Sequence, residues 1–202
     1  MIYKLVCAGV DNFKELYQKD NDEIIIAIDG GYQTLINNDL VIDYYFGDFD
    51  SLKNKNIECN NIFEYPSIKD KGDLELCLDY LIYNFKINAN DKILIYNATG
   101  GRLDHYYAVL NCLKKYSKYN INVLDDKNNI YVKGGNFEIL KTKYKYISFF
   151  SIEENTVISI NGCKYNINNY KLDVNDNLCL SNEIVEKCDI KVNKNILIIE
   201  SI

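Results

Sequence analysis

The chain is predicted to fold as an α/β domain with a mostly parallel sheet, followed by an all-β antiparallel sandwich. Up to about residue 125, short apolar runs alternate with longer segments in which apolar residues recur at helical spacing. After residue 127 the helical spacing disappears, and short segments of alternating apolar and polar residues follow one another. Strands that alternate with helices are typical of parallel sheets, whereas successive strands are typical of antiparallel ones.

The first half is predicted to contain six strands and two long helices. Over residues 73–85, apolar side chains fall at i, i+3, i+4, i+7 and i+11, which is the stripe of a helix packed on a sheet. A second stripe, formed by Leu103, Tyr106, Leu110 and Leu113, predicts a helix over residues 103–116. The predicted strands are residues 2–8, 23–28, 41–46, 62–65, 92–97 and 121–124.

The second half is predicted to consist of short strands separated by turns. Gly134-Gly135, residues 153–155 and residues 193–195 separate the alternating segments, and Asn161-Gly162 is a strong signal for a two-residue hairpin turn. We place the domain boundary in the polar cluster near residue 127, which gives domains of 1–127 and 128–202. The predicted strands are residues 130–133, 137–140, 146–150, 157–160, 165–167, 178–180, 190–192 and 196–199.

Composition limits the classes of function. The formal net charge of -6 over 202 residues argues against a protein that binds duplex nucleic acid, which usually presents a basic face. No apolar stretch approaches the roughly 20 residues of a membrane span, and residues 1–10 are predicted to form a strand rather than a signal peptide. The seven cysteines form no Cys-x-x-Cys pair, so we expect buried thiols in a reducing compartment. A cytoplasmic protein with no nucleic-acid or membrane partner is the expectation.

The segment Gly-Asp-Phe-Asp-Ser at residues 47–51 places two carboxylates directly after an apolar run. If the strand continues past Phe46, Asp48 and Asp50 point to the same side, because side chains alternate along a strand. Two carboxylates at the carboxyl end of a strand suit Mg2+, which proteins hold through one or two carboxylates together with substrate phosphates. The same residue types also make ordinary turns, so both interpretations stay open for this segment alone.

Three further polar motifs follow predicted strands at the edge where ligands bind in parallel sheets. They are Asp-Gly-Gly at residues 29–31, Lys-Asp-Lys-Gly-Asp at 69–73 and Thr-Gly-Gly-Arg-Leu-Asp-His at 99–105. Each has a structural alternative. These alternatives are a tight turn around Asp29, a helix N-cap at Asp73, loop charges at Lys69 and Asp70, and a packed helix residue at His105.

Together the motifs predict a site for a divalent cation and a polyphosphate. A glycine-rich turn before a helix suits an anion, and Lys69 and Arg102 add positive charge. Positioning and charge stabilisation are what phosphoryl transfer requires, yet neither a Gly-x-x-x-x-Gly-Lys-Ser/Thr loop nor a His-Arg-Asp kinase signature is present. Six carboxylates at one edge would repel one another without a cation, and they are Asp29, Asp48, Asp50, Asp70, Asp73 and Asp104.

These motifs, together with Tyr65-Pro66 and Ser181-Asn182-Glu183, resemble those of the thiamine pyrophosphokinase (thiamine diphosphokinase) family in order and spacing over nearly the whole chain. The resemblance implies a Rossmann-like, nucleotide- and metal-binding catalytic domain followed by a sandwich that binds thiamine and forms a homodimer. Thiamine would lie between one subunit's α/β domain and the other's sandwich. The implied reaction is Mg2+-dependent transfer of pyrophosphate from the co-substrate ATP to the thiamine hydroxyl, which leaves AMP.

The resemblance also implies roles for individual residues. Ser181 and Asn182 match the segment that faces thiamine, and Asp73 or Asp104 would accept the proton of the hydroxyl. Arg102 is expected to act in catalysis as well as in phosphate binding. The implied Mg2+ ligands are Asp48, Asp50 and Asp73, with Asp104 near the metal, and the implied nucleotide and phosphate contacts are Lys69, Asp70 and Arg102, with Asp29 in the same cleft.

Three departures from the family pattern stand out. Gly72 replaces a threonine, so a hydroxyl contact to phosphate is either missing or supplied by a backbone N-H. Ile42 replaces a proline before the third strand, which is expected to be harmless. The chain has no tryptophan to stack on thiamine, so any such stacking must come from its tyrosines or phenylalanines.

Two other functions stay open. An Asp-x-Asp after an apolar strand also introduces haloacid-dehalogenase-like phosphohydrolases, in which Asp48 would be the nucleophile. That alternative leaves residues 100–105 and the Ser181 segment unexplained. A non-enzymatic thiamine or nucleotide sensor on the same fold is the other alternative, suggested by Gly72 and the missing tryptophan.

Overall fold

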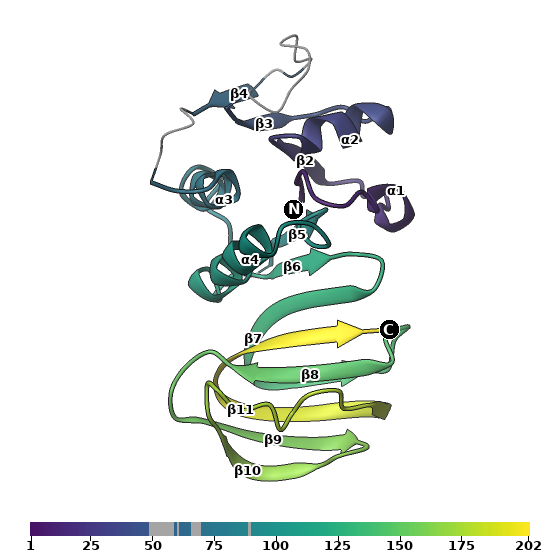
Figure 1. Cartoon of the computed structure of the whole chain (residues 1–202), viewed down its shortest axis with the longest axis vertical. Helices are drawn as coiled ribbons and strands as arrows, with labels where there is room; N and C mark the ends of the chain where they lie inside the picture. The colour runs from purple at the N-terminus through teal and green to yellow at the C-terminus, as the bar shows by residue number, and fades with distance from the viewer. Residues whose placement is uncertain (49–58, 60, 66–69, 89) are drawn as a thin grey trace. The chain divides into compact units, whose positions relative to one another are not determined.

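The computed structural model describes residues 1–48, 59, 61–65, 70–88 and 90–202 (Figure 1). The chain divides into two compact units. The first comprises Met1–Cys112 and Tyr119–Asp126, and the second comprises Leu113–Lys118 and Lys127–Ile202. The last turn of α4 (Leu103–Lys115) therefore belongs to the second unit. The strand that follows it in the chain, β6 (Ile121–Leu124), belongs to the first.

Within the described residues, the first unit contains a six-stranded parallel sheet, which confirms the predicted parallel arrangement. The strand order is β6-β5-β1-β2-β3-β4. β3 begins three residues later than predicted, because the Asp43 carboxylate accepts a hydrogen bond from the Ile25 backbone N-H and Val41 is exposed. The strands are β1 (Ile2–Val6), β2 (Glu23–Ile28), β3 (Tyr44–Gly47), β4 (Asn61–Glu64), β5 (Lys92–Tyr96) and β6 (Ile121–Leu124).

Helices cover both faces of this sheet, because the strands present apolar side chains on each face. α1 (Phe13–Leu16) and α2 (Gly31–Asn37) pack their apolar side chains on one face, around Val6, Ala27 and Tyr45. α3 (Asp73–Asn84) lies on the other side in Figure 1, where the Tyr80 ring contacts those of Phe46 and Phe63 at 5.4 and 4.3 Å. α3 therefore confirms the helix predicted over residues 73–85.

α4 (Leu103–Lys115) is also close to its predicted range, but its buried stripe differs from the predicted one. The buried positions are Val109, Cys112, Leu113 and Tyr116, which follow the i, i+3, i+4, i+7 spacing of a helix. Leu103, which we expected in the stripe, is 81% exposed. The first turn of α4, which follows the glycine-rich motif, is therefore exposed to solvent.

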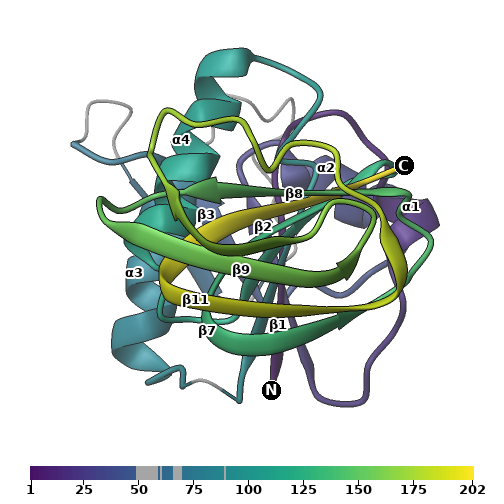
Figure 2. The same cartoon turned by 90° about the horizontal axis from the view of Figure 1, so that it is seen from below.

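The second unit, all of whose residues are described, is antiparallel and is organised around β11 (Figure 2). β11 pairs with β7 along most of its length. On its other edge it pairs with β9 over residues 184–192 and with β8 over residues 196–201. The strands are β7 (Asn128–Leu140), β8 (Tyr146–Ser151), β9 (Thr156–Cys163), β10 (Ile167–Leu172) and β11 (Ile184–Ser201).

Three of the predicted turns in this half are wrong, because they are irregularities inside long strands. Residues 134–135 lie within β7, residues 161–162 within β9 and residues 193–195 within β11. Gly162 has φ +87° and lies against the backbone of β11, where a Cβ would come 2.0 Å from the Lys187 carbonyl oxygen. It therefore serves a bulge rather than a hairpin turn. Residues 178–180, predicted as a strand, form a turn, and residues 165–166 precede β10.

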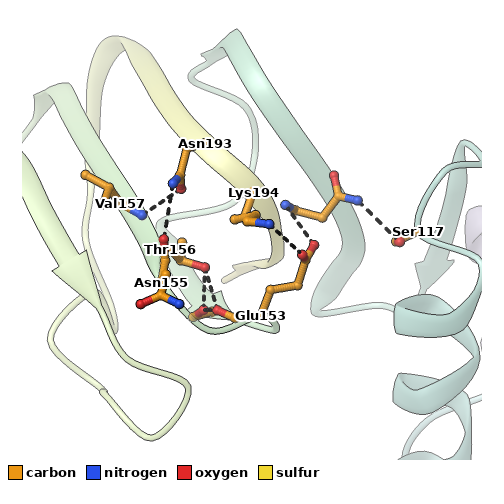
Figure 3. A network of polar contacts seen from close by, with 9 residues as sticks. Ser117, Glu153, Asn155, Thr156, Val157, Asn193 and Lys194 are labelled. Atoms are coloured by element: carbon orange, nitrogen blue, oxygen red, sulfur yellow. Dashed lines mark hydrogen bonds and ion pairs between the residues drawn. The ribbon is translucent and has the colours of Figure 1, made fainter.

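A polar network holds β11 where its register shifts between Val192 and Ile196 (Figure 3). Asn193 accepts a 2.7 Å hydrogen bond from the Val157 N-H and donates one of 3.1 Å to the Asn155 carbonyl. The neighbouring Lys194 is 3.6 Å from a Glu153 carboxylate oxygen. Asn193 thus satisfies one backbone N-H and one backbone carbonyl at the start of β9, at the point where the register of β11 shifts.

The seven cysteines, all among the described residues, are free thiols, and five of them are buried. Three of the buried ones, Cys163, Cys179 and Cys188, lie together in the core of the second unit. No helix built from the described residues is both long enough and apolar enough to cross a membrane.

Candidate functional site at the carboxyl edge of the parallel sheet

The end of β2 is joined to the end of β3 through Asp29. Its backbone N-H donates a 2.8 Å hydrogen bond to the Phe46 carbonyl, and its φ of +48° turns the chain into α2 directly after the strand. The tight turn that we considered for Asp29 is therefore present, and it carries the Asp29 carboxylate to the edge of the sheet where β3 also ends. The structural and the functional interpretations of this residue are compatible.

Gly47 allows the Asp29 carboxylate to lie over the end of β3. A Cβ at residue 47 would stand 2.3 Å from Asp29 Oδ1 and 2.5 Å from the Tyr45 hydroxyl oxygen. A Cβ that lies within 3 Å of another heavy atom forces one of the two groups to move, so any residue other than glycine would displace Asp29 or Tyr45. Because residue 47 has no side chain, the Asp29 carboxylate can lie directly beside the backbone that leads into Asp48.

Asp29 directly follows β2, and Asp73 is the first residue of α3, the helix after β4. In a parallel sheet both positions lie at the carboxyl edge of the strands. Burial, with smaller contributions from the negative charges of Asp29 and Asp73, raises the pKa of the Cys7 thiol just after β1 to about 12. The structure therefore brings Asp29 and Asp73 to one edge of the sheet, at which Asp48 directly follows β3.

Asp73 is the first residue of α3, and Gly72 occupies the N-cap position in an extended conformation. The N-cap interpretation of Asp73 is therefore wrong. A carboxylate at the first helical position is still favoured by the helix dipole. Gly72 has nothing within 4 Å of the place where a Cβ would stand, so a larger residue would fit there in the protein alone.

Two predicted site residues, Asp50 and Lys69, lie outside the described residues, whereas Asp70 is described and exposed. Within the part of the chain that the structure describes, no three His, Cys, Asp or Glu side chains gather closely enough to hold a metal ion. The predicted set of Asp48, Asp50 and Asp73 includes one residue beyond that part, so its geometry stays a prediction.

The first turn of α4 presents an ion pair to solvent. Arg102 Nη2 is 2.5 Å from Asp104 Oδ2, and Arg102 Nε donates a second hydrogen bond of 3.1 Å to Asp104 Oδ1. The hydrogen bond from the Arg102 guanidinium lowers the pKa of Asp104 to about 2, so this carboxyl stays ionised at neutral pH. His105 is exposed, which contradicts the interpretation of a packed helix residue.

A buried amide, which the sequence analysis missed as a site residue, organises the loop between β5 and α4. Asn97 is 1% exposed and has φ +54°. Its amide nitrogen donates to the Asp11 carboxylate at 3.1 Å and to the Thr34 hydroxyl at 3.4 Å, and its oxygen accepts from the Asn12 N-H at 3.2 Å. The signal in the sequence was weak, because an asparagine at the end of an apolar strand also fits a common turn.

Ser181 and Asn182, the predicted thiamine contacts, differ in availability. Asn182 is 3% exposed, and its amide is engaged with both the N-H and the carbonyl of Tyr165, at 3.0 and 2.7 Å. Its oxygen also accepts from the Glu183 N-H. Ser181 is exposed, with φ +55° and its N-H bound to the Ser148 hydroxyl at 2.9 Å. In this chain Asn182 holds the segment in place and Ser181 presents its side chain.

A shallow groove of about 1170 Å³ lies on the second unit, over β7, β9, β10 and β11. Asparagines and apolar side chains contribute equally to its lining, and none of the predicted site residues is among them. The groove therefore does not displace the carboxylate edge as the candidate site.

Comparisons with known proteins agree along the whole chain. A family model described as "Thiamin pyrophosphokinase, catalytic domain" matches residues 15–124, and one described as "Thiamin pyrophosphokinase, vitamin B1 binding domain" matches residues 136–197. The thiamine pyrophosphokinase of Bacillus subtilis (strain 168) is 33% identical over 176 residues, which cover 82% of this chain and 80% of that protein.

Solved structures with the same fold include two bacterial proteins. A crystal structure of thiamine pyrophosphokinase from Bacillus subtilis superposes with a TM-score of 0.88 at 26% identity, covering 100% of this chain and 99% of that one. The thiamin pyrophosphokinase of Geobacillus thermodenitrificans gives 0.85 at 25% identity, with coverage of 100% and 98%.

Proposed function

The chain belongs to the thiamine pyrophosphokinase family, and from this premise we propose how its residues use ATP and Mg2+ to convert thiamine into thiamine diphosphate. The proposal is supported by the close approach of Asp29 to Gly47, the residue before Asp48, and by the position of Asp73 at the start of α3. The parallel sheet also brings the loop before Arg102, which follows β5, to its carboxyl edge.

The donor set fits Mg2+. The carboxylates at this edge are hard oxygen ligands, and the cation commonly combines one or two of them with substrate phosphates and water. Asp48 and Asp73 would hold the cation. Asp50, which is not among the described residues, is proposed as the third ligand. When bound, Mg2+ would neutralise negative charge on the phosphates. Asp29 and Asp70 would line the same cleft.

Arg102 is proposed to bind the phosphates of ATP through its planar guanidinium, together with Lys69. Its present partner is Asp104, on the exposed first turn of α4. Phosphate oxygens offer the same bidentate geometry as a carboxylate, so the guanidinium can turn to the nucleotide or bridge it to Asp104. Both residues stay in the proposed catalytic set.

The thiamine hydroxyl is proposed to attack the β-phosphorus. A bond forms between that oxygen and the β-phosphorus, the bond from the β-phosphorus to the oxygen bridging it to the α-phosphate breaks, and AMP leaves. The candidate acceptors for the hydroxyl proton are Asp73 and Asp104.

The two halves are proposed to divide the work. Residues 1–127 would form the Rossmann-like domain that binds nucleotide and metal, and residues 128–202 a sandwich that binds thiamine and forms the homodimer. Ser181, with its exposed side chain, would face thiamine, whereas Asn182 would act by holding that segment. We propose a cytoplasmic homodimer with sites shared between subunits, with no nucleic-acid or membrane partner.

One incubation with ATP, Mg2+ and thiamine tests the proposal. We expect AMP and thiamine diphosphate in equal amounts, and no turnover after chelation of the metal. Release of orthophosphate without thiamine would instead indicate the phosphohydrolase with Asp48 as nucleophile, and binding without turnover would indicate a sensor.

Substitution of the carboxylates tests the metal assignment. Asp48→Asn and Asp50→Asn should each nearly abolish turnover while the folded state persists, because an amide is a poorer Mg2+ ligand than a carboxylate. Glu154→Gln, on an exposed turn of the second unit, is the matched control and should keep wild-type turnover. Wild-type rates in Asp48→Asn would remove this residue from the metal site.

A further inference from the structure

Asp125 is a buried carboxylate for which the proposed mechanism has no use. It follows β6 directly, and the residue is 6% exposed. Aspartate is almost never fully buried unless it is paired, because desolvation of the charge is costly. Its place at the carboxyl edge of the parallel sheet puts it on the same side as the candidate site.

Asp125 binds the loop that precedes Arg102. The Thr99 hydroxyl donates a 2.6 Å hydrogen bond to Asp125 Oδ2, and Thr99 is followed at once by Gly100, Gly101 and Arg102. A distance of 2.6 Å is at the short end of the range for hydrogen bonds donated by a hydroxyl group. The bond therefore fixes the residue from which the glycine-rich turn begins.

The same carboxylate also lies near the first turns of α4. The pKa of Tyr106 is raised by burial and, secondarily, by the negative charge of Asp125. Tyr106 donates its backbone N-H to the Arg102 carbonyl. Asp125 therefore contacts the loop at Thr99, and its charge also acts on Tyr106 in α4.

The segment after β1 holds the opposite side of the loop. The Gly9 N-H donates to the Asn97 carbonyl at 2.8 Å, and the Val10 N-H donates to the Thr99 carbonyl at 3.4 Å. The backbone around Thr99 is therefore bound on one side by residues 9–10, while its side chain is bound by Asp125. Glycine has few intrinsic conformational restraints, so the anchoring of Thr99 limits the positions that Arg102 can take beyond Gly100 and Gly101.

We propose that Asp125 is a positioning residue which, through the Thr99 hydroxyl, holds residues 100–102 in the conformation that binds the phosphates of ATP. This inference rests on the proposed function, because it assigns the loop to the nucleotide. In this proposal Asp125 acts through Thr99 and not by contact with substrate or metal. Its contribution is to limit the conformations of a glycine-rich turn before ATP arrives.

Two pairs of variants test the role. Thr99→Val keeps the shape of the side chain but removes the donor, and it should raise the KM for ATP about tenfold with the KM for thiamine unchanged within about twofold. Thr99→Ser keeps the hydroxyl and should restore ATP binding. Asp125→Ala should match Thr99→Val, and the double variant should be little worse than either, because both remove one interaction.

Asp125→Asn separates positioning from a direct role. The amide oxygen still accepts the hydrogen bond from Thr99, so the KM for ATP should stay within about threefold of wild type. Equal damage from Asp125→Asn and Asp125→Ala would show that the charge acts on metal or substrate and would overturn the proposal. An unchanged KM for ATP in Thr99→Val would overturn it too.

A readout without turnover keeps this inference distinct from the proposed function. Hydrogen exchange of the backbone amides at residues 100–103 should be faster in Thr99→Val than in wild type or Thr99→Ser. Thr156→Val is the matched control, since Thr156 is a fully buried threonine in the second unit with its hydroxyl hydrogen-bonded. It should leave both that exchange and the KM for ATP unchanged. If wild type forms no thiamine diphosphate, the proposed function fails, and the exchange measurement alone decides whether Asp125 orders the loop.

Discussion

Single residues at the candidate site are constrained by close approach, and Gly47 is the clearest case. Gly47→Ala would place a methyl group 2.3 Å from Asp29 Oδ1 and 2.5 Å from the Tyr45 hydroxyl oxygen, both of which are buried atoms. We expect a loss of about 1–3 kcal/mol in the free energy of unfolding. Thiamine diphosphate formation should fall as well, because Asp29 must move.

Urea unfolding and a turnover assay check the prediction for Gly47. Gly72→Ala is the matched control for stability, because no atom lies within 4 Å of its added Cβ. Its unfolding free energy should equal that of wild type or exceed it slightly. If Gly47→Ala were as stable and as active as wild type, the close packing of Asp29 over Gly47 would be contradicted.

Glu200 is predicted to make stability depend on pH. It is 5% exposed and accepts a 2.6 Å hydrogen bond from Asn129, and burial raises its pKa above the ordinary 4.5. A pKa that is higher in the folded state than in the unfolded state means that folding favours the protonated carboxyl. Its contribution to stability is fully present below the unfolded pKa and is lost as pH rises through the folded one.

Glu200→Gln keeps a neutral side chain of the same shape and should remove this dependence. Between about pH 4.5 and pH 8, the unfolding free energy of the variant should fall less than that of wild type. Urea titrations at several pH values measure the difference. Parallel curves for the two proteins would show that the Glu200 carboxyl does not contribute to the pH dependence.

Among the secondary-structure elements, β1 is tied to the chain before β2 by a buried cation. Lys4 is 1% exposed, and its ammonium lies 2.7 Å from Asp20 and 2.6 Å from Glu23 while it donates to the Gln18 carbonyl. Lys4→Met would leave the Glu23 carboxylate buried without this partner. We expect a loss of about 3–5 kcal/mol in unfolding free energy.

Lys187→Met is the control for Lys4, because Lys187 forms exposed pairs with Glu138 and Asp189. Exposed pairs are screened by water and contribute little, so this variant should unfold close to wild type. A second variant, Lys4→Met combined with Glu23→Gln, should recover part of the loss. Equal stability of Lys4→Met and Lys187→Met would contradict the role of the buried cation.

The elements also show where prediction from local pattern ends. β2 and β6 match their predicted ranges, because a buried parallel strand is an apolar run bounded by polar residues. β7 and β11 do not, since glycine and asparagine pairs within them resemble turns. A bulge and a hairpin turn use the same residue types at positive φ, and only the partner strand distinguishes them.

At the scale of the whole molecule, the proposed shared site predicts complementation between variants. Asp48→Asn disables the first domain, and Ser181→Arg places a cation where the cationic thiamine is proposed to bind. Each variant alone should be inactive. Refolded together in equal amounts, they should recover about a quarter of wild-type activity, because half of the dimers are mixed and each mixed dimer has one intact site.

Product formation and molecular mass in solution check this prediction. Two copies of the same variant, refolded in the same way, are the control and should stay inactive. Full activity in a monomeric fraction at micromolar concentration would defeat the shared-site arrangement, as would absence of complementation by two variants that each still form dimers.

The sequence by itself determined the family, the parallel-then-antiparallel order of the chain and the carboxylates that its motifs share, because these depend on local patterns and on residue types at particular spacings. Tertiary structure decided which polar groups are already engaged. Asn182 is held by Tyr165, and Thr99 by Asp125, a residue that no motif contains. Hydrogen bonds between residues distant along the chain depend on where the strands end in space, and no local pattern encodes that position.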